Sequence, residues 1–165
     1  MTPSALRLAL RVCCAAAFVA TVACSRNNDI YNSYVALPNT GWGTDSLAVF
    51  RVNIDDTISA YDMYFMLRNQ NNYAYQNLWL FVDVVAPDGA VARDTVDCVL
   101  AHHDGRWIGS GWGSLYDSQH NYRLNTRFAK AGTYRFRICH GMRDDAIEGI
   151  HSIGLRIVPT QHTPQ

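Results

Sequence analysis

The sequence predicts an all-β domain, an antiparallel β-sandwich of jelly-roll or Greek-key type with about eight strands. Short apolar or alternating runs recur between turn residues, and no long segment has the helical period. The composition also favours sheet, because the helix-favouring lysine and glutamate occur once each, as Lys130 and Glu148, whereas tyrosine and valine are common. The predicted strands differ in length, which favours a sandwich over a closed barrel.

Four strands are predicted in the first half of the domain, at residues 29–38, 47–54, 61–69 and 78–85. Pro38 ends the first and marks it as an edge strand. In the second, Val52 and Ile54 alternate with polar neighbours. The fourth is continuously apolar, so we expect a central strand that is buried on both faces. Truncation of Phe81 to alanine should then cost several kcal/mol by leaving a cavity.

Four more strands are predicted in the second half, at residues 91–100, 122–128, 133–138 and 153–158. Pro87-Asp88-Gly89 is a strong turn sequence, so residues 78–100 should form a hairpin. Strict alternation of Tyr134, Phe136 and Ile138 with polar residues predicts a half-buried strand. Residues 144–150 are expected to form a helical turn.

The first 23 residues have the layout of an export signal. Arg7 and Arg11 precede the apolar run Val12–Ala23, which is shorter than the roughly 20 residues that span a bilayer. Thr21-Val22-Ala23-Cys24 resembles a bacterial lipobox, although leucine is usual at the Thr21 position. Cys24 would then become the lipidated N-terminus, held in a membrane by several acyl chains. The alternative is ordinary secretion, with cleavage near Ala23 and an unmodified Cys24.

These features predict the organisation of the chain. Residues 1–23 form the signal peptide, 24–30 the lipidated cysteine and flexible tether, 31–159 the sandwich, and 160–165 a disordered tail. Cleavage leaves 142 residues with a net charge of −2, because two of the fourteen basic residues and none of the fourteen acidic ones precede the cut. Without a basic excess, nucleic-acid binding is disfavoured.

Two of the five cysteines, Cys98 and Cys139, lie in the predicted sandwich. An exported chain can form disulfides, so these two could be bridged. The alternative is a pair of free thiols, because the sequence does not give the separation that a bridge requires.

Few residues have spacings that indicate catalysis. His102-His103-Asp104 is the one cluster of metal-ligand types, but neighbours on a strand point to opposite faces, so we expect no metal site. Ser110 lacks the Gly-x-Ser-x-Gly spacing of a nucleophile elbow. The pairs Asp55-Asp56 and Asp144-Asp145 are best explained as turn residues. We therefore expect neither a cofactor nor an enzymatic activity.

A glycine-rich loop at residues 104–117 is the candidate interaction site. Its candidate contact residues are charged or aromatic: Asp104, Arg106, Trp107, Trp112, Tyr116 and Asp117. The large aromatic faces could contact a protein partner or stack on a glycan. In the alternative interpretation, the aromatic rings fold inward and plug one end of the sandwich.

The same loop carries a resemblance to a known family. Residues 104–117 resemble the gliding-motility-associated lipoprotein family GldH of the Bacteroidetes. The likeness continues over most of the mature chain, in these segments: Tyr34–Pro38 with Gly41-Trp42, Tyr75–Val82, Pro87-Asp88-Gly89, Gly132–Phe136, Met142-Arg143, Gly149-Ile150 and Gly154–Ile157.

The resemblance implies a cell-envelope lipoprotein that supports the gliding machinery, which works alongside the type IX secretion apparatus. Its partners would be the membrane, through the N-terminal lipid, and other envelope lipoproteins or proteins of the motility and secretion machinery. It implies no catalytic residue and no cofactor. The tether lacks the acidic run that resembles a surface-export signal in that phylum, so we expect the periplasmic face of the outer membrane. A surface lipoprotein that binds glycans through the aromatic loop is the alternative.

Overall fold

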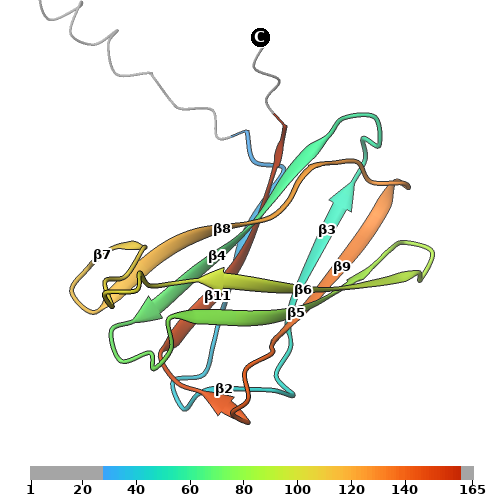
Figure 1. The fold of residues 1–165 in the computed structure, drawn as a ribbon. Helices are drawn as coiled ribbons and strands as arrows, with labels where there is room; N and C mark the ends of the chain where they lie inside the picture. The colour runs from blue at the N-terminus through green and yellow to red at the C-terminus, as the bar shows by residue number, and fades with distance from the viewer. Residues whose placement is uncertain (1–27, 161–165) are drawn as a thin grey trace, which may run out of the picture.

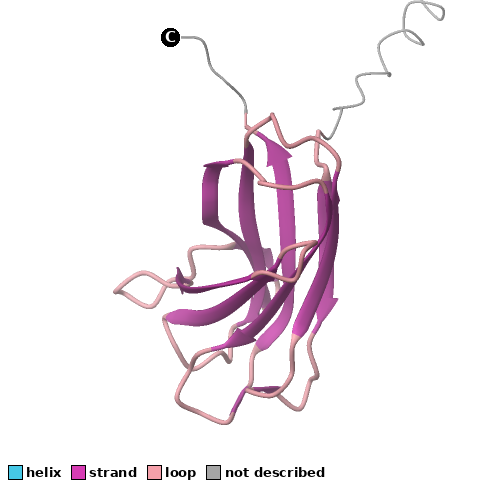
Figure 2. Cartoon of the chain, turned by 90° about the vertical axis from the view of Figure 1, so that its right-hand side faces the viewer, coloured by secondary structure: helices cyan, strands magenta, loops and turns pink. Residues whose placement is uncertain are grey.

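Two antiparallel sheets pack face to face as a sandwich (Figures 1 and 2). The computed structural model describes residues 28–160. In spatial order, the first sheet contains β1 (Tyr31–Ala36), β11 (Ile150–Pro159), β4 (Tyr61–Gln70), β8 (Leu115–Thr126) and β7 (Ser110–Trp112). The second sheet contains β3 (Ala48–Ile54), β9 (Gly132–His140), β5 (Asn77–Val85) and β6 (Val91–Val99). A short ribbon of β2 (Trp42–Gly43) and β10 (Ala146–Ile147) lies at one end.

The strand order is that of a jelly roll. Eight long strands form the orders β1-β11-β4-β8 and β3-β9-β5-β6, and the chain repeatedly crosses from one sheet to the other. This interleaving of two four-stranded sheets is the double Greek key of jelly-roll domains. The predicted antiparallel β-sandwich is therefore confirmed. Three short strands, β2, β7 and β10, add to the eight.

Alternating burial explains why these segments form strands. Along β4 every second residue is buried, and β3 follows the same period. The inward side chains of both sheets meet in one apolar core. Its largest fully buried members are Trp42, Phe50, Phe65 and Phe136. The indole N–H of Trp42 donates to the carbonyl oxygen of Ser46 (2.7 Å), so this buried polar group is satisfied.

The predicted hairpin of residues 78–100 is formed by β5 and β6, which pair from Asn77 opposite Val99 to Val85 opposite Val91. Gly89 has a φ of +87°, which glycine adopts without strain. Its N–H donates to the carbonyl oxygen of Ala86 (2.9 Å) and closes the turn.

The expectation that residues 78–85 are buried on both faces is wrong. From Asn77 to Val82 of β5 only alternate residues such as Leu80 are buried, whereas Trp79 is 40% and Phe81 is 43% exposed. In a two-layered sandwich each sheet has one inner face, so a continuous apolar run puts half its side chains outside. The cost of several kcal/mol predicted for Phe81→Ala depended on burial of this ring and is therefore no longer expected.

The helical turn expected at residues 144–150 is also wrong. Ala146 and Ile147 pair with Gly43 and Trp42, which lie about a hundred residues earlier in the sequence. Long-range pairing of this kind overrides local propensity.

Cys98 and Cys139 are free thiols in the structure. Cys98 lies on β6 and faces the core, and its burial raises the pKa of the thiol to about 12. Cys139 lies on β9 opposite Phe81, with β5 between the two cysteine-bearing strands. Strands two places apart are separated by roughly 9.5 Å, which exceeds the Cα separation of a disulfide.

The two ends of the sandwich can be told apart by strand register. At the entry end, where β1 begins, Tyr31 pairs with Ile157, which pairs with Met63 of β4. The far end lies where β4 finishes at Gln70, about 23 Å further along the strand. The predicted signal peptide, the lipidated Cys24 and all but Thr160 of the predicted tail (residues 160–165) lie outside the described residues. No helix between residues 28 and 160 is long and apolar enough to cross a membrane.

Candidate functional site

The β7–β8 hairpin (residues 110–126) contains much of the predicted interaction loop. Trp112 pairs with Leu115 across a two-residue turn, and Gly113 in that turn has a φ of +70°. A Cβ on Gly111 would lie 1.9 Å from the carbonyl oxygen of Leu115, so only glycine allows this close approach of the two strands. The hairpin lies at the far end, because Leu115 pairs with Gln70 (Figure 1).

The three predicted aromatic residues have different surroundings. Trp107 is half-buried, with its ring centroid 5.9 Å from Tyr116 and 6.5 Å from the core residue Tyr73. These rings fold inward, as the alternative interpretation of the loop predicts. Trp112 does the opposite and is 97% exposed. The structure therefore leaves one free aromatic face at the hairpin tip.

The predicted charged residues form two separate ion pairs. Asp117 accepts two hydrogen bonds from Arg68 of β4 (2.6 and 2.8 Å), which links the hairpin to its neighbouring strand. Asp104 pairs with Arg106 (2.7 Å) inside a tight turn, and this hydrogen bond lowers the pKa of the Asp104 carboxyl. Asp104 and Arg106 thus stabilise their own turn.

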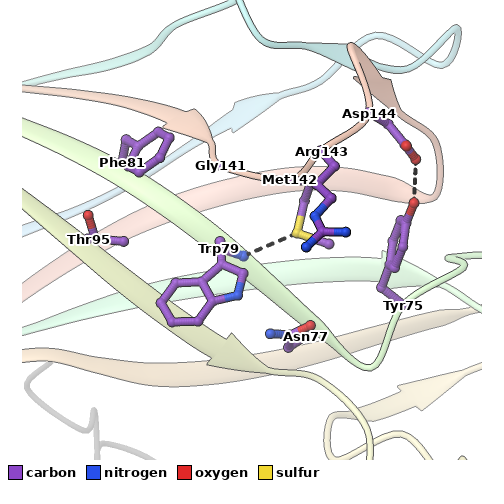
Figure 3. A pocket seen from close by; sticks show the side chains of 9 residues that line it. All are labelled: Tyr75, Asn77, Trp79, Phe81, Thr95, Gly141, Met142, Arg143 and Asp144. Carbon is purple, nitrogen blue, oxygen red and sulfur yellow. Dashed lines mark hydrogen bonds between the residues drawn. The ribbon is translucent and has the colours of Figure 1, made fainter.

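A groove that the sequence did not predict lies on the outer face of the second sheet, at the far end (Figure 3). Its volume is about 560 Å³. The floor is formed by Trp79 and Phe81 of β5, and the wall by Met142 and Arg143 of the β9–β10 loop. The remaining lining residues are Tyr75, Asn77, Thr95, Gly141 and Asp144.

Several contacts hold the wall of this groove against its floor. The N–H of Gly141 donates to the carbonyl oxygen of Trp79 (2.7 Å), and the N–H of Trp79 lies 3.4 Å from the sulfur of Met142. The Tyr75 hydroxyl donates to Asp144, and this hydrogen bond raises the pKa of Tyr75. A Cβ on Gly141 would lie 3.0 Å from the Phe81 ring, so this glycine lets the ring rest against the backbone.

The sequence contained a pattern that could have located the groove. Along β5 the inward positions Leu78 to Val84 are all aliphatic, whereas the outward positions carry two aromatic residues flanked by polar ones: Asn77, Trp79, Phe81 and Asp83. A period-two analysis of this apolar run would have separated these two sets.

The other side chains that could act in catalysis or metal binding make contacts that stabilise the fold. Between residues 28 and 160 no group of three or more metal-ligand side chains comes together. Ser118 and His120 are hydrogen-bonded (2.8 Å), but Ser118 is only 8% exposed and burial lowers the pKa of His120. The Asp56 carboxylate accepts the N–H groups of Ile58 and Ser59 (2.7 and 3.1 Å), as expected of a turn residue.

Comparison with known proteins identifies relatives over most of the chain. The sequence profile of the GldH lipoprotein family matches residues 29–157. The gliding motility lipoprotein GldH homolog of Christiangramia forsetii is 32% identical over 135 residues, covering 78% of this chain and 82% of that protein. The gliding motility lipoprotein GldH of Flavobacterium johnsoniae is 29% identical over 135 residues, covering 78% and 83%.

Among solved structures, an arabinose-bound α-L-arabinofuranosidase overlaps with 80% of this chain and 20% of its own, at 11% identity. The TM-score is 0.38, which is too low to carry an argument about fold or function.

Proposed function

Because the chain belongs to the GldH lipoprotein family, as its sequence motifs predict, we propose that it is a lipid-anchored, non-catalytic component of the cell envelope. In this proposal it binds proteins of the gliding or secretion machinery, or other envelope lipoproteins, through the β7–β8 hairpin. The anchor is Cys24, and the domain lies at the periplasmic face of the outer membrane.

The exposure of Trp112 is the observation that carries the proposed contact. A tryptophan that is 97% exposed makes few stabilising contacts within the described chain. Tryptophan, with tyrosine and arginine, is enriched among the residues that dominate the binding energy of protein interfaces. The hairpin beneath it is held by the Arg68–Asp117 ion pair and by the packing of Trp107 on Tyr116. The backbone that carries Trp112 is therefore held in place before a partner binds, which limits the entropy lost on binding.

The position of the hairpin suits a tethered protein. The described chain begins next to β1 at the entry end, whereas the hairpin turn lies at the far end (Figure 1). A domain anchored through the residues before β1 would present Trp112 away from the membrane. Its partners would then be reached in the space beyond the lipid surface.

A non-catalytic role is supported by how the reactive groups are used. The Ser118 hydroxyl faces the core, where a substrate could not reach it. Asp144 accepts the hydroxyl of Tyr75, and Asp97 accepts the amide of Asn77 (2.7 Å). These carboxylates already have donors from the protein.

The proposed contact is tested by photocrosslinking in cells, with a photoreactive amino acid at position 112 of the full chain. Ile58 provides the matched control, because it is 84% exposed and lies in the loop between β3 and β4 at the entry end. We expect position 112 to give adducts with specific envelope proteins, identified by mass spectrometry, and position 58 to give none of these.

Anchoring is tested separately by Cys24→Ala. The variant should leave the membrane fraction, whereas the wild-type chain should stay with it. Equal adducts from positions 112 and 58 would contradict the proposed contact, and a Cys24→Ala chain that remains in the membrane fraction would contradict the anchor.

A further inference from the structure

We propose that the groove on the outer face of the second sheet is a saccharide-binding site, with Trp79 and Phe81 as its stacking platforms. This inference goes beyond the proposed function and does not involve the β7–β8 hairpin. It moves the glycan-binding hypothesis from the loop of residues 104–117 to a surface that the loop does not form.

The two aromatic side chains of the floor are available to a ligand. Trp79 and Phe81 are two residues apart on β5, so they project from the same face with about 6.6 Å between their backbone positions. Each is about two-fifths exposed, and within residues 28–160 neither ring pairs with another aromatic ring. In Figure 3 the Phe81 ring lies on the Gly141 side of β5 and the Trp79 ring on the other side, so the two flat apolar surfaces can each pack against a different sugar ring of an oligosaccharide.

Polar groups at the rim of the groove suit a polyhydroxylated ligand. The Asn77 side chain donates to Asp97, and its amide oxygen can still accept. The Thr95 hydroxyl and the Arg143 guanidinium also line the groove, and Arg143 forms no ion pair among the described residues. Planar groups with donors and acceptors beside an aromatic floor provide hydrogen bonds to hydroxyls around the sugar ring.

The shape of the surface favours a saccharide over a protein partner. Trp79 and Phe81 share a groove with Met142 and Arg143 of the β9–β10 loop, so the site is concave (Figure 3). Trp112, in contrast, projects from a hairpin tip, as a residue that enters a partner's pocket does. The hydrogen bond of Gly141 to Trp79 and that of Tyr75 to Asp144 form the groove in advance, which lowers the entropy lost on binding.

The test measures binding of the full chain, in detergent micelles, to an array of bacterial oligosaccharides. In a second measurement chitotetraose and cellotetraose are titrated into the protein in solution, and binding is followed by the change in tryptophan fluorescence. We expect binding to at least one of these saccharides. Trp79→Ala should raise the Kd by at least about tenfold, because it removes one stacking platform. Trp112→Ala is the matched control and should leave the Kd unchanged.

Two further variants keep the test decisive. Phe81→Ala should weaken binding as well, and Gly141→Ala should weaken it by displacing the Phe81 ring while leaving both aromatic residues in place. Each variant is first shown to be folded, by a single cooperative thermal unfolding transition.

Three outcomes would overturn the proposal. The first is that no saccharide tested binds. The second is that binding is lost in Trp112→Ala but kept in Trp79→Ala. The third is that a photocrosslinker at Thr95 forms protein adducts while no saccharide binds. None of them bears on the crosslinks at position 112, so this inference and the proposed function can fail independently.

Discussion

The β7–β8 hairpin and the groove of the second sheet both present aromatic side chains at the far end of the sandwich, but they do so by different means. At the hairpin, a tight turn holds Trp112 away from all its neighbours. In the groove, Trp79 and Phe81 lie on a sheet face that no third layer covers within the described chain. Exposure thus comes from local turn geometry in one case and from the number of layers in the other.

The largest expected effect is the difference in stability between removing a core side chain and removing a side chain from the floor of the groove. Leu80→Ala should lower the free energy of unfolding by about 2–5 kcal/mol, because Leu80 is fully buried and its loss leaves a cavity. Phe81→Ala should cost less than about 1.5 kcal/mol, because the ring is half outside. Urea unfolding of both variants measures the difference. Equal costs would mean that the outer face of the sheet is covered.

Disrupting the hairpin should have the next largest effect. Gly111→Ala should cost about 1–3 kcal/mol, because the new Cβ overlaps the carbonyl oxygen of Leu115. Hydrogen exchange should become faster at the amides that join β7 to β8. Gly43→Ala is the control, since its Cβ would have no neighbour closer than 3.9 Å. If the Gly111 variant matched this control, the hairpin would not be tightly paired.

A pH effect is expected beneath the groove, at His140. This side chain is 1% exposed, and burial lowers its pKa, so the folded state favours the neutral ring. Stability should therefore decrease as the pH falls below about 6.5, the pKa of an unfolded histidine, with at most about 1.4 kcal/mol per pH unit from each such residue.

The measurement is urea unfolding between pH 7.5 and 5, for the wild-type chain and His140→Phe. The variant should have a shallower pH dependence. A remaining slope is expected from His120, whose pKa burial also lowers, whereas Asp29 and Asp83 have lowered pKa values and act only at more acidic pH. If the free energy of unfolding of His140→Phe depended on pH as steeply as that of the wild type, the fold would not resist protonation of His140.

The smallest expected effect is that of Trp112→Ala. Removing a side chain that contacts almost nothing should change the free energy of unfolding by less than about 0.5 kcal/mol. Chemical unfolding of the purified variant measures this. A loss above about 1 kcal/mol would show that Trp112 packs against the chain, and the contrast between the hairpin and the groove would then be weaker.

Part of the candidate site could be predicted from the sequence. The glycines and aromatics of residues 104–117 indicated a structured loop with large contact faces, and the structure places a tight hairpin there. The sequence could not show that Trp107 packs inward while Trp112 is exposed, because the inward position of Trp107 depends on Tyr73. The groove was missed because its wall, Met142 and Arg143, lies about sixty residues from its floor.

The sequence by itself determined the class of the fold and the family of the chain. Alternating side chains, the Pro87-Asp88-Gly89 turn and the scarcity of helix-favouring residues act locally, so strands and hairpins can be derived from them. Only the tertiary structure decided which apolar side chains face water. That choice depends on which sheet covers which face, and contacts between distant segments, such as Gly141 against Phe81, decide it.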